Sequence, residues 1–73
     1  METEKLIKMA NQIGDFFEAF PDQVEARKEI ASHLNRFWNL NMRKSIAKHV
    51  KDQQGSGLHV RVIEAIQQHL KVN

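Results

Sequence analysis

The residues of this chain best suited to metal binding or acid–base catalysis are four histidines, His33, His49, His59 and His69. None of them belongs to a His-Glu-x-x-His motif or to an aspartate-rich loop, and the sequence contains no cysteine that could act as a thiolate ligand. Isolated histidines are more often partly buried residues at the edge of a core than metal ligands. The sequence therefore predicts no catalytic, cofactor-binding or metal-binding residue.

A second candidate for chemistry is the stretch Gly55-Ser56-Gly57, which superficially resembles a phosphate-binding loop. A P-loop follows a strand and needs a lysine and a further glycine, whereas this stretch follows an expected helix and lacks both. We interpret it as a flexible connection. The chain is accordingly predicted not to be an enzyme in its own right.

Basic side chains are concentrated in the second part of the chain, although the net charge of the whole is only +2. Residues 1–25 hold two lysines against six acidic residues, which gives −4, and residues 26–73 hold nine basic residues against three acidic ones, which gives +6. The densest basic group comprises Arg36, Arg43, Lys44, Lys48 and Lys51. The three lysines share one helical face, and such a face is most often simply solvated.

The basic group also allows a docking surface for an acidic partner or for nucleic acid. A small basic helical DNA-binding regulator is therefore the alternative function, with residues 42–49 as its recognition helix. The break before that helix contains no glycine and the helix is short, which disfavours a helix-turn-helix. We expect no nucleic-acid partner.

Four helices must position these residues, and apolar side chains at helical spacing place them at about 4–20, 23–38, 42–52 and 58–71. Pro21 ends the first helix, Asn39 and Asn41 are positioned to cap the third, and Ser56 or Gly57 to cap the fourth. A chain of 73 residues is expected to form one all-α domain, residues 1–73, because so short a chain buries only about 60% of its unfolded surface.

The aromatic residues exceed what so small a core can hold. Four phenylalanines and one tryptophan compete with the aliphatic set for inward directions, so we expect part of this surface to be exposed as an interface. Phe37 and Trp38 are adjacent and project about 100° apart on a helix. We expect Phe37 to face the core and Trp38, with Met42 and Arg43, to face a partner. Gly14 suggests close approach by another backbone.

Two segments carry a resemblance to a known family. Met9-Ala10-Asn11-Gln12-Ile13 is followed by Phe16 and Phe17, and after Pro21 come His33, Phe37-Trp38 and Met42-Arg43. Over Lys8 to Arg43 this pattern resembles the delta subunits of NAD-linked molybdenum- or tungsten-dependent formate dehydrogenases. The family usually has a proline two positions after the tryptophan, where this chain has Leu40.

The resemblance implies an accessory subunit that helps to assemble or stabilise the catalytic subunit or to insert its cofactor. The metal-pterin cofactor, iron–sulfur clusters and flavin would belong to other subunits, and this chain would bind none. No apolar run approaches the roughly 20 residues of a membrane span, and the acidic beginning of the sequence is unlike a secretory signal, so a cytoplasmic location is expected. Self-association of the isolated chain is left open. The expected partner-binding residues are Met9, Asn11, Gln12, Phe16, His33, Trp38, Met42 and Arg43.

Overall fold

The computed structural model describes residues 3–72, and within them four α-helices account for most of the chain, as the sequence predicts. A short 3₁₀ turn, η1, follows the first helix. The elements are α1 (Thr3–Phe16), η1 (Phe17–Ala19), α2 (Gln23–Phe37), α3 (Leu40–Gln53) and α4 (Val60–His69).

The first connection forms as the position of Pro21 predicts. The last turn of the expected first helix tightens into η1, and Phe20 then adopts the extended backbone (φ −65°, ψ 125°) that the following proline favours. Asp22 starts α2, because its carboxylate accepts hydrogen bonds from the amides of Val24 (2.9 Å) and Glu25 (3.2 Å). A proline and one capping carboxylate thus set the bend between α1 and α2.

The second connection depends on Asn39, whose side-chain oxygen accepts a hydrogen bond from the amide of Met42 at 2.9 Å. The helix begins at Leu40, two residues earlier than the expected start at Met42. Leu40 is therefore the first helical residue, the one position where a proline is also well tolerated. A leucine here keeps the fold because Asn39 supplies the cap.

The third connection reverses the chain through Gln54, Gly55 and Gly57, which all have positive φ (58°, 72° and 89°). The expected capping of α4 by Ser56 or Gly57 is wrong. His59 occupies the N-cap position without a side-chain cap, and α4 begins at Val60 rather than residue 58. It ends at His69, where Leu70 becomes extended.

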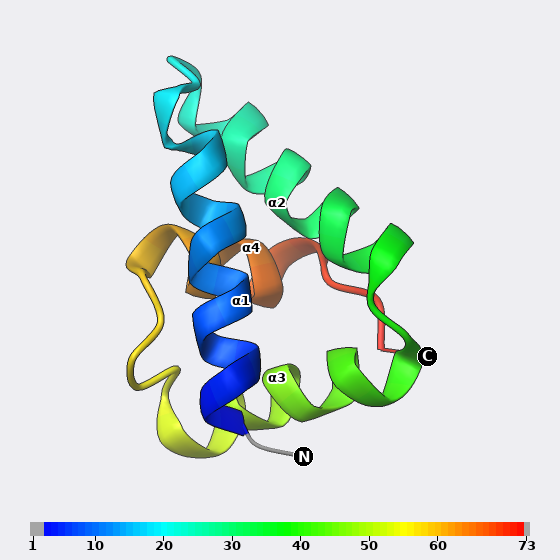
Figure 1. The fold of residues 1–73 in the computed structure, drawn as a ribbon. Coiled ribbons are helices and arrows are strands. Elements are labelled where there is room, and N and C mark those ends of the chain that lie inside the picture. Colours follow the sequence, from blue (N-terminus) through cyan, green and yellow to red (C-terminus); the bar gives the residue numbers. More distant parts are fainter. Residues whose placement is uncertain (1–2, 73) are drawn as a thin grey trace.

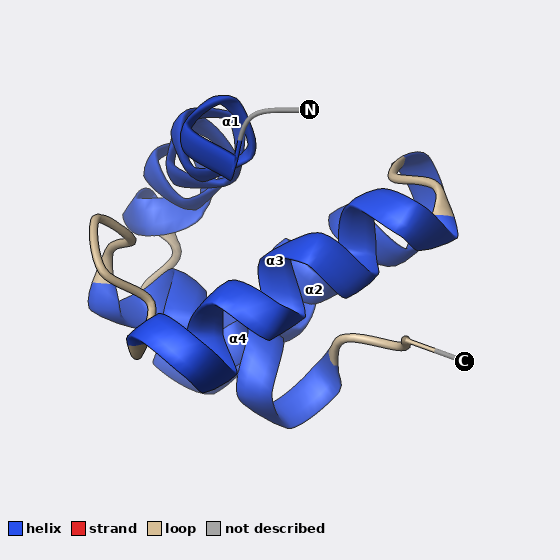
Figure 2. Cartoon of the chain, turned by 90° about the horizontal axis from the view of Figure 1, so that it is seen from below, coloured by secondary structure: helices blue, strands red, loops and turns tan. Residues whose placement is uncertain are grey.

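The helices arrange around a core in which α4 packs mainly against α2, and α3 packs against α1. Figure 1 shows α1 and α2 meeting at η1 and diverging toward α3, which closes their open end, while α4 crosses behind them. Figure 2, seen from below, separates α1 from α2 and α3. The largest fully buried side chains come from all four helices: Leu6, Ile30, Leu34, Ile46 and Val62.

Candidate partner-binding groove

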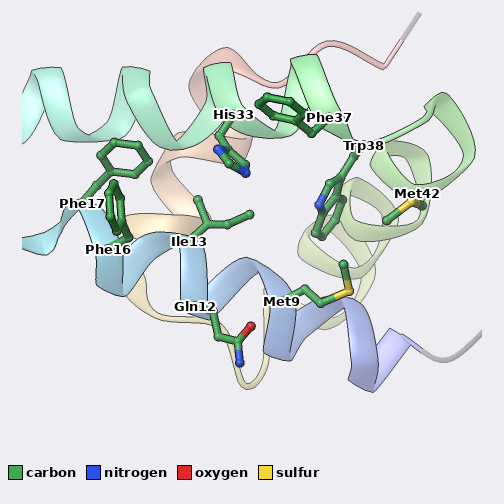
Figure 3. Close-up of a pocket in the computed structure, with 9 residues that line it drawn as sticks. All are labelled: Met9, Gln12, Ile13, Phe16, Phe17, His33, Phe37, Trp38 and Met42. Atoms are coloured by element: carbon green, nitrogen blue, oxygen red, sulfur yellow. The ribbon is translucent and has the colours of Figure 1, made fainter.

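The diverging ends of α1 and α2 leave an open groove of about 630 Å³. Six of the eight predicted partner-binding residues line it, and they come from three helices; Figure 3 shows Gln12 at the outer edge, with its side chain directed away from the other five. The fold therefore brings together residues that lie between positions 9 and 42 of the sequence. The groove is lined by Met9, Gln12, Ile13, Phe16, Phe17, His33, Phe37, Trp38 and Met42.

Helix α1 forms one wall because Met9, Ile13 and Phe16 recur at four- and three-residue spacing on one of its faces. The aromatic rings continue past the end of the helix. Phe16 and Phe17 meet edge to face with centroids 5.0 Å apart, and Phe17 meets Phe20 in the same way at 5.2 Å. Edge-to-face pairs of this kind fix ring orientation, so this wall is shaped before any partner arrives.

Helix α2 forms the other wall through His33 and Phe37, one turn apart. Their rings lie 4.8 Å apart between centroids, and the guanidinium carbon of Arg36 lies 5.6 Å from the centre of the Phe37 ring. Phe37 is therefore flanked by an imidazole and a guanidinium group. This edge of the groove combines an apolar surface with hydrogen-bond donors.

The expected orientation of Phe37 and Trp38 is wrong. Trp38 is 5% exposed and belongs to the core, whereas Phe37 is 67% exposed. The helical-wheel argument fails because α2 ends at Phe37 and Trp38 has an extended backbone (φ −90°, ψ 135°). Arg43 then fixes the tryptophan, since its guanidinium donates to the carbonyl oxygen of Trp38 at 2.7 Å.

The other predicted partner-binding residues, Asn11 and Arg43, do not line the groove. The Asn11 amide donates to the Gly57 carbonyl at 2.9 Å and accepts from the His59 amide at 2.9 Å. The Arg43 guanidinium donates to the carbonyl oxygens of Lys71 (2.9 Å), Asn35 (3.1 Å) and Trp38. Both side chains hold distant segments of the backbone in place.

Three groove residues, Ile13, Phe17 and Phe37, are absent from the predicted partner-binding set, and Phe37 was expected to face the core. Ile13 and Phe17 are partly buried against the core and also reach the groove. Their shared helical face with Met9 and Phe16 is a signal that the sequence contained. The exposure of Phe37 had no such signal, because it depends on where α2 ends.

Gly14 is buried where α1 crosses α4. A Cβ atom on this residue would lie 2.5 Å from Cγ2 of Val62, so the predicted close approach occurs, made by a side chain rather than a backbone. The absence of a side chain lets the two helices touch. Gly14 therefore fixes the distance of α4 from the α1 wall of the groove.

The basic group separates into different environments. Lys44, Lys48 and Lys51 are exposed on α3, while Arg43 is occupied within the molecule and Arg36 stands beside Phe37. The five residues therefore do not form one continuous basic surface.

Two histidines have partners within the chain: His49 Nε2 lies 2.7 Å from the Ser56 carbonyl oxygen, and His59 Nδ1 lies 3.2 Å from Asp15 Oδ1. Within residues 3–72, no three histidine or acidic side chains are grouped as a metal site would require. In the same residues no helix has the length and apolar character needed to cross a membrane.

The fold and the groove define a small all-helical protein with exposed aromatic residues on its surface. The chain belongs to the NADH-dependent formate dehydrogenase delta subunit family, FdsD, whose family model matches residues 5–71. The match extends the recognised segment, Lys8 to Arg43, over nearly the whole sequence. Neither a curated protein nor a solved structure matches the chain.

Proposed function

We propose that this chain is a non-catalytic accessory subunit of an NAD-dependent molybdenum or tungsten formate dehydrogenase, and that its groove binds the catalytic subunit in the cytoplasm. Family membership supports the enzyme. The observation that carries the binding role is the exposure of Phe16 (75%) and Phe37 (67%) on either side of one groove. Exposed aromatic residues with methionine and arginine beside them are the composition of an interface core.

The energetic argument rests on the two phenylalanines. Full burial of a phenylalanine side chain stabilises by about 1.5 to 3 kcal/mol relative to its exposed state. In the isolated chain neither Phe16 nor Phe37 gains most of that free energy, although both stand in the same groove. A partner that covers the groove would gain it from both side chains.

The partner surface that we propose comprises five of the predicted residues that line the groove, Met9, Gln12, Phe16, His33 and Met42, together with Phe37, while the buried Trp38 forms the floor beneath them. Asn11 and Arg43 act indirectly in this proposal. Asn11 holds the segment before α4 to α1, and Arg43 holds the backbone of Trp38 at the end of the groove. Both keep the groove in shape.

Binding of this kind would assist assembly by mass action. A ligand that binds the folded catalytic subunit and not its unfolded chain stabilises the fold by about 2.7 kcal/mol at 100 times its Kd. An accessory subunit could therefore keep the catalytic subunit folded while the metal-pterin cofactor is inserted. The cofactors themselves would be held by other subunits.

The test is co-expression of a tagged chain with the formate dehydrogenase subunits of its host. Phe37→Ser should reduce recovery of the catalytic subunit, its molybdenum or tungsten content and its formate oxidation. Val60→Ser is the matched control, because Val60 is 69% exposed and is not a groove-lining residue. The proposal is wrong if both variants recover fully loaded enzyme at the wild-type yield.

A further inference from the structure

We propose that the groove receives an amphipathic α-helix of the partner, which carries apolar anchors on one face and a carboxylate beside them. This inference rests on the proposed function and deepens it by giving the conformation and charge of the partner segment. It follows from three features of the groove. Its lining consists of side chains that cannot pair with the backbone of an extended segment, its shape suits a helix, and the charges around it are positive.

The lining of the groove selects a helix over an extended segment. Its walls are side chains of helices, and only Gln12 and His33 among the nine lining residues are polar. An extended segment would turn a row of backbone N–H and C=O groups toward this apolar surface and leave them unpaired. A helix satisfies its backbone hydrogen bonds internally, so it can bury an apolar face here without that cost.

The shape of the groove is also that of a helix-binding site. Helices α1 and α2 meet at η1 and separate toward α3 (Figure 1), and the groove of about 630 Å³ lies between the side chains of these two walls. Figure 3 shows Met9 and Met42 next to Trp38 at the wide end, Met9 below the indole and Met42 to its right. Unbranched methionine side chains adapt to irregular partner surfaces, as in other grooves that bind amphipathic helices.

The charges around the groove give the partner a polarity. Arg36 is exposed beside Phe37, and within residues 3–72 it forms no ion pair. Lys5 lies one turn before Met9 on the same face of α1, so a second cation adjoins the wide end. A carboxylate near the anchors would meet these cations and the donor groups of His33.

A second copy of this chain fits the same surface less well. Isologous pairing of two grooves would bring Lys5 and Arg36 of both copies to one interface. Like charges juxtaposed in this way oppose association, whereas an acidic helix neutralises them. The charges therefore favour a different protein as the occupant.

The experiment uses the isotope-labelled full chain and overlapping 24-residue peptides that span the host's formate dehydrogenase catalytic subunit. One peptide with an apolar face and an adjacent carboxylate should shift the Trp38 indole signal and become helical on binding. Arg36→Glu should weaken its binding about tenfold, and exchange of the peptide carboxylate for lysine should restore binding to that variant. Lys51→Glu, on the exposed face of α3, is the matched control and should leave affinity within about twofold.

The inference is overturned if the bound peptide remains extended, or if Arg36→Glu and Lys51→Glu weaken binding equally. It is also overturned if no peptide binds while the intact catalytic subunit is captured by wild-type chain and lost by Phe37→Ser, because the groove would then receive a folded surface. That outcome leaves the proposed function intact. If the wild-type chain failed to capture the intact catalytic subunit, both the inference and the proposed function would be wrong.

Discussion

The groove and the seam where α4 joins the rest of the molecule use their residues in opposite ways. In the groove, two phenylalanines that would ordinarily enter a core are 75% and 67% exposed. At the seam, the polar side chains of Asn11, Asn35 and Arg43 are engaged with the backbone of residues 57–71. The amide of Asn35 alone donates to the His69 carbonyl and accepts from the Lys71 amide.

This difference separates residues that hold the fold from residues left for a partner. Side-chain to backbone hydrogen bonds fasten a short fourth helix whose buried apolar residues are few, Val62, Ala65 and Ile66. The two exposed phenylalanines of the groove, Phe16 and Phe37, add little to this fastening. Residue type alone therefore misleads in this chain, because its polar residues serve stability and part of its aromatic set remains exposed.

The largest expected effect is on stability, and it separates Trp38 from Phe37. Trp38→Ala removes a side chain that is 95% buried and should cost about 3 to 5 kcal/mol, enough to unfold much of so small a protein. Phe37→Ala should change stability by only about 0.5 kcal/mol and weaken capture of the catalytic subunit about thirtyfold. Thermal unfolding followed by circular dichroism, with parallel capture assays, measures both. If Phe37→Ala were the less stable of the two variants, the assignment of Trp38 to the core and of Phe37 to the partner surface would be refuted.

The next effect concerns the seam. Asn11→Ala removes two hydrogen bonds of 2.9 Å to residues 46 and 48 positions away and should cost about 1 to 2 kcal/mol. Hydrogen exchange of the His59 amide should accelerate. Gln12→Ala, in the neighbouring exposed position, is the control and should leave both quantities nearly unchanged. Equal stability of the two variants would show that the seam does not depend on Asn11.

Gly14 tests how closely the helices must approach. Alanine normally stabilises a helix interior by about 1 kcal/mol relative to glycine, but here its Cβ would meet Val62 at 2.5 Å. We expect Gly14→Ala to destabilise by about 1 kcal/mol net, because overpacking outweighs propensity. In a Val62→Ala background the same change should become neutral or stabilising in denaturant titrations. A stabilising effect in the wild-type background would contradict the close contact.

The smallest effect is expected on the exposed face of α3. Replacing Lys44, Lys48 and Lys51 together by glutamine should alter stability by about 0.5 kcal/mol at most and leave capture of the catalytic subunit almost unchanged. Anisotropy titrations of the wild-type chain with random duplex DNA should show weak binding that disappears as salt is raised. Tight, sequence-dependent and salt-resistant binding would instead support the regulator alternative.

The fold was largely predictable because its breaks are local. Pro21 restricts Phe20, Asp22 caps the helix that follows, and Asn39 caps the next, all through neighbours within four residues. The start of α4 was not predictable in the same way, because it begins without a side-chain cap and after three residues with positive φ. Six groove residues belong to the two segments that carry the family resemblance, and the bend at Pro21 and the cap at Asn39 bring those segments together.

The remaining errors concern contacts between residues far apart in sequence. Asn11 is hydrogen-bonded to Gly57, 46 positions away in the sequence, and Arg43 to Lys71, 28 positions away. No local sequence pattern predicts either hydrogen bond. The inversion of Phe37 and Trp38 has the same origin. A helical wheel predicts side-chain directions only for residues inside a helix. The direction of the Trp38 side chain is set instead by its extended backbone and by Arg43.

The most direct test of the proposed groove is site-specific photo-crosslinking in the assembled enzyme. A photoreactive benzoylphenylalanine is placed at Phe37 in one variant and at Val60 in another, two positions of nearly equal exposure, 67% and 69%. Irradiation of the native complex should crosslink the catalytic subunit from position 37 and not from position 60. Crosslinking from position 60 alone would contradict the account, because the partner would then cover the face of α4 and leave the groove empty.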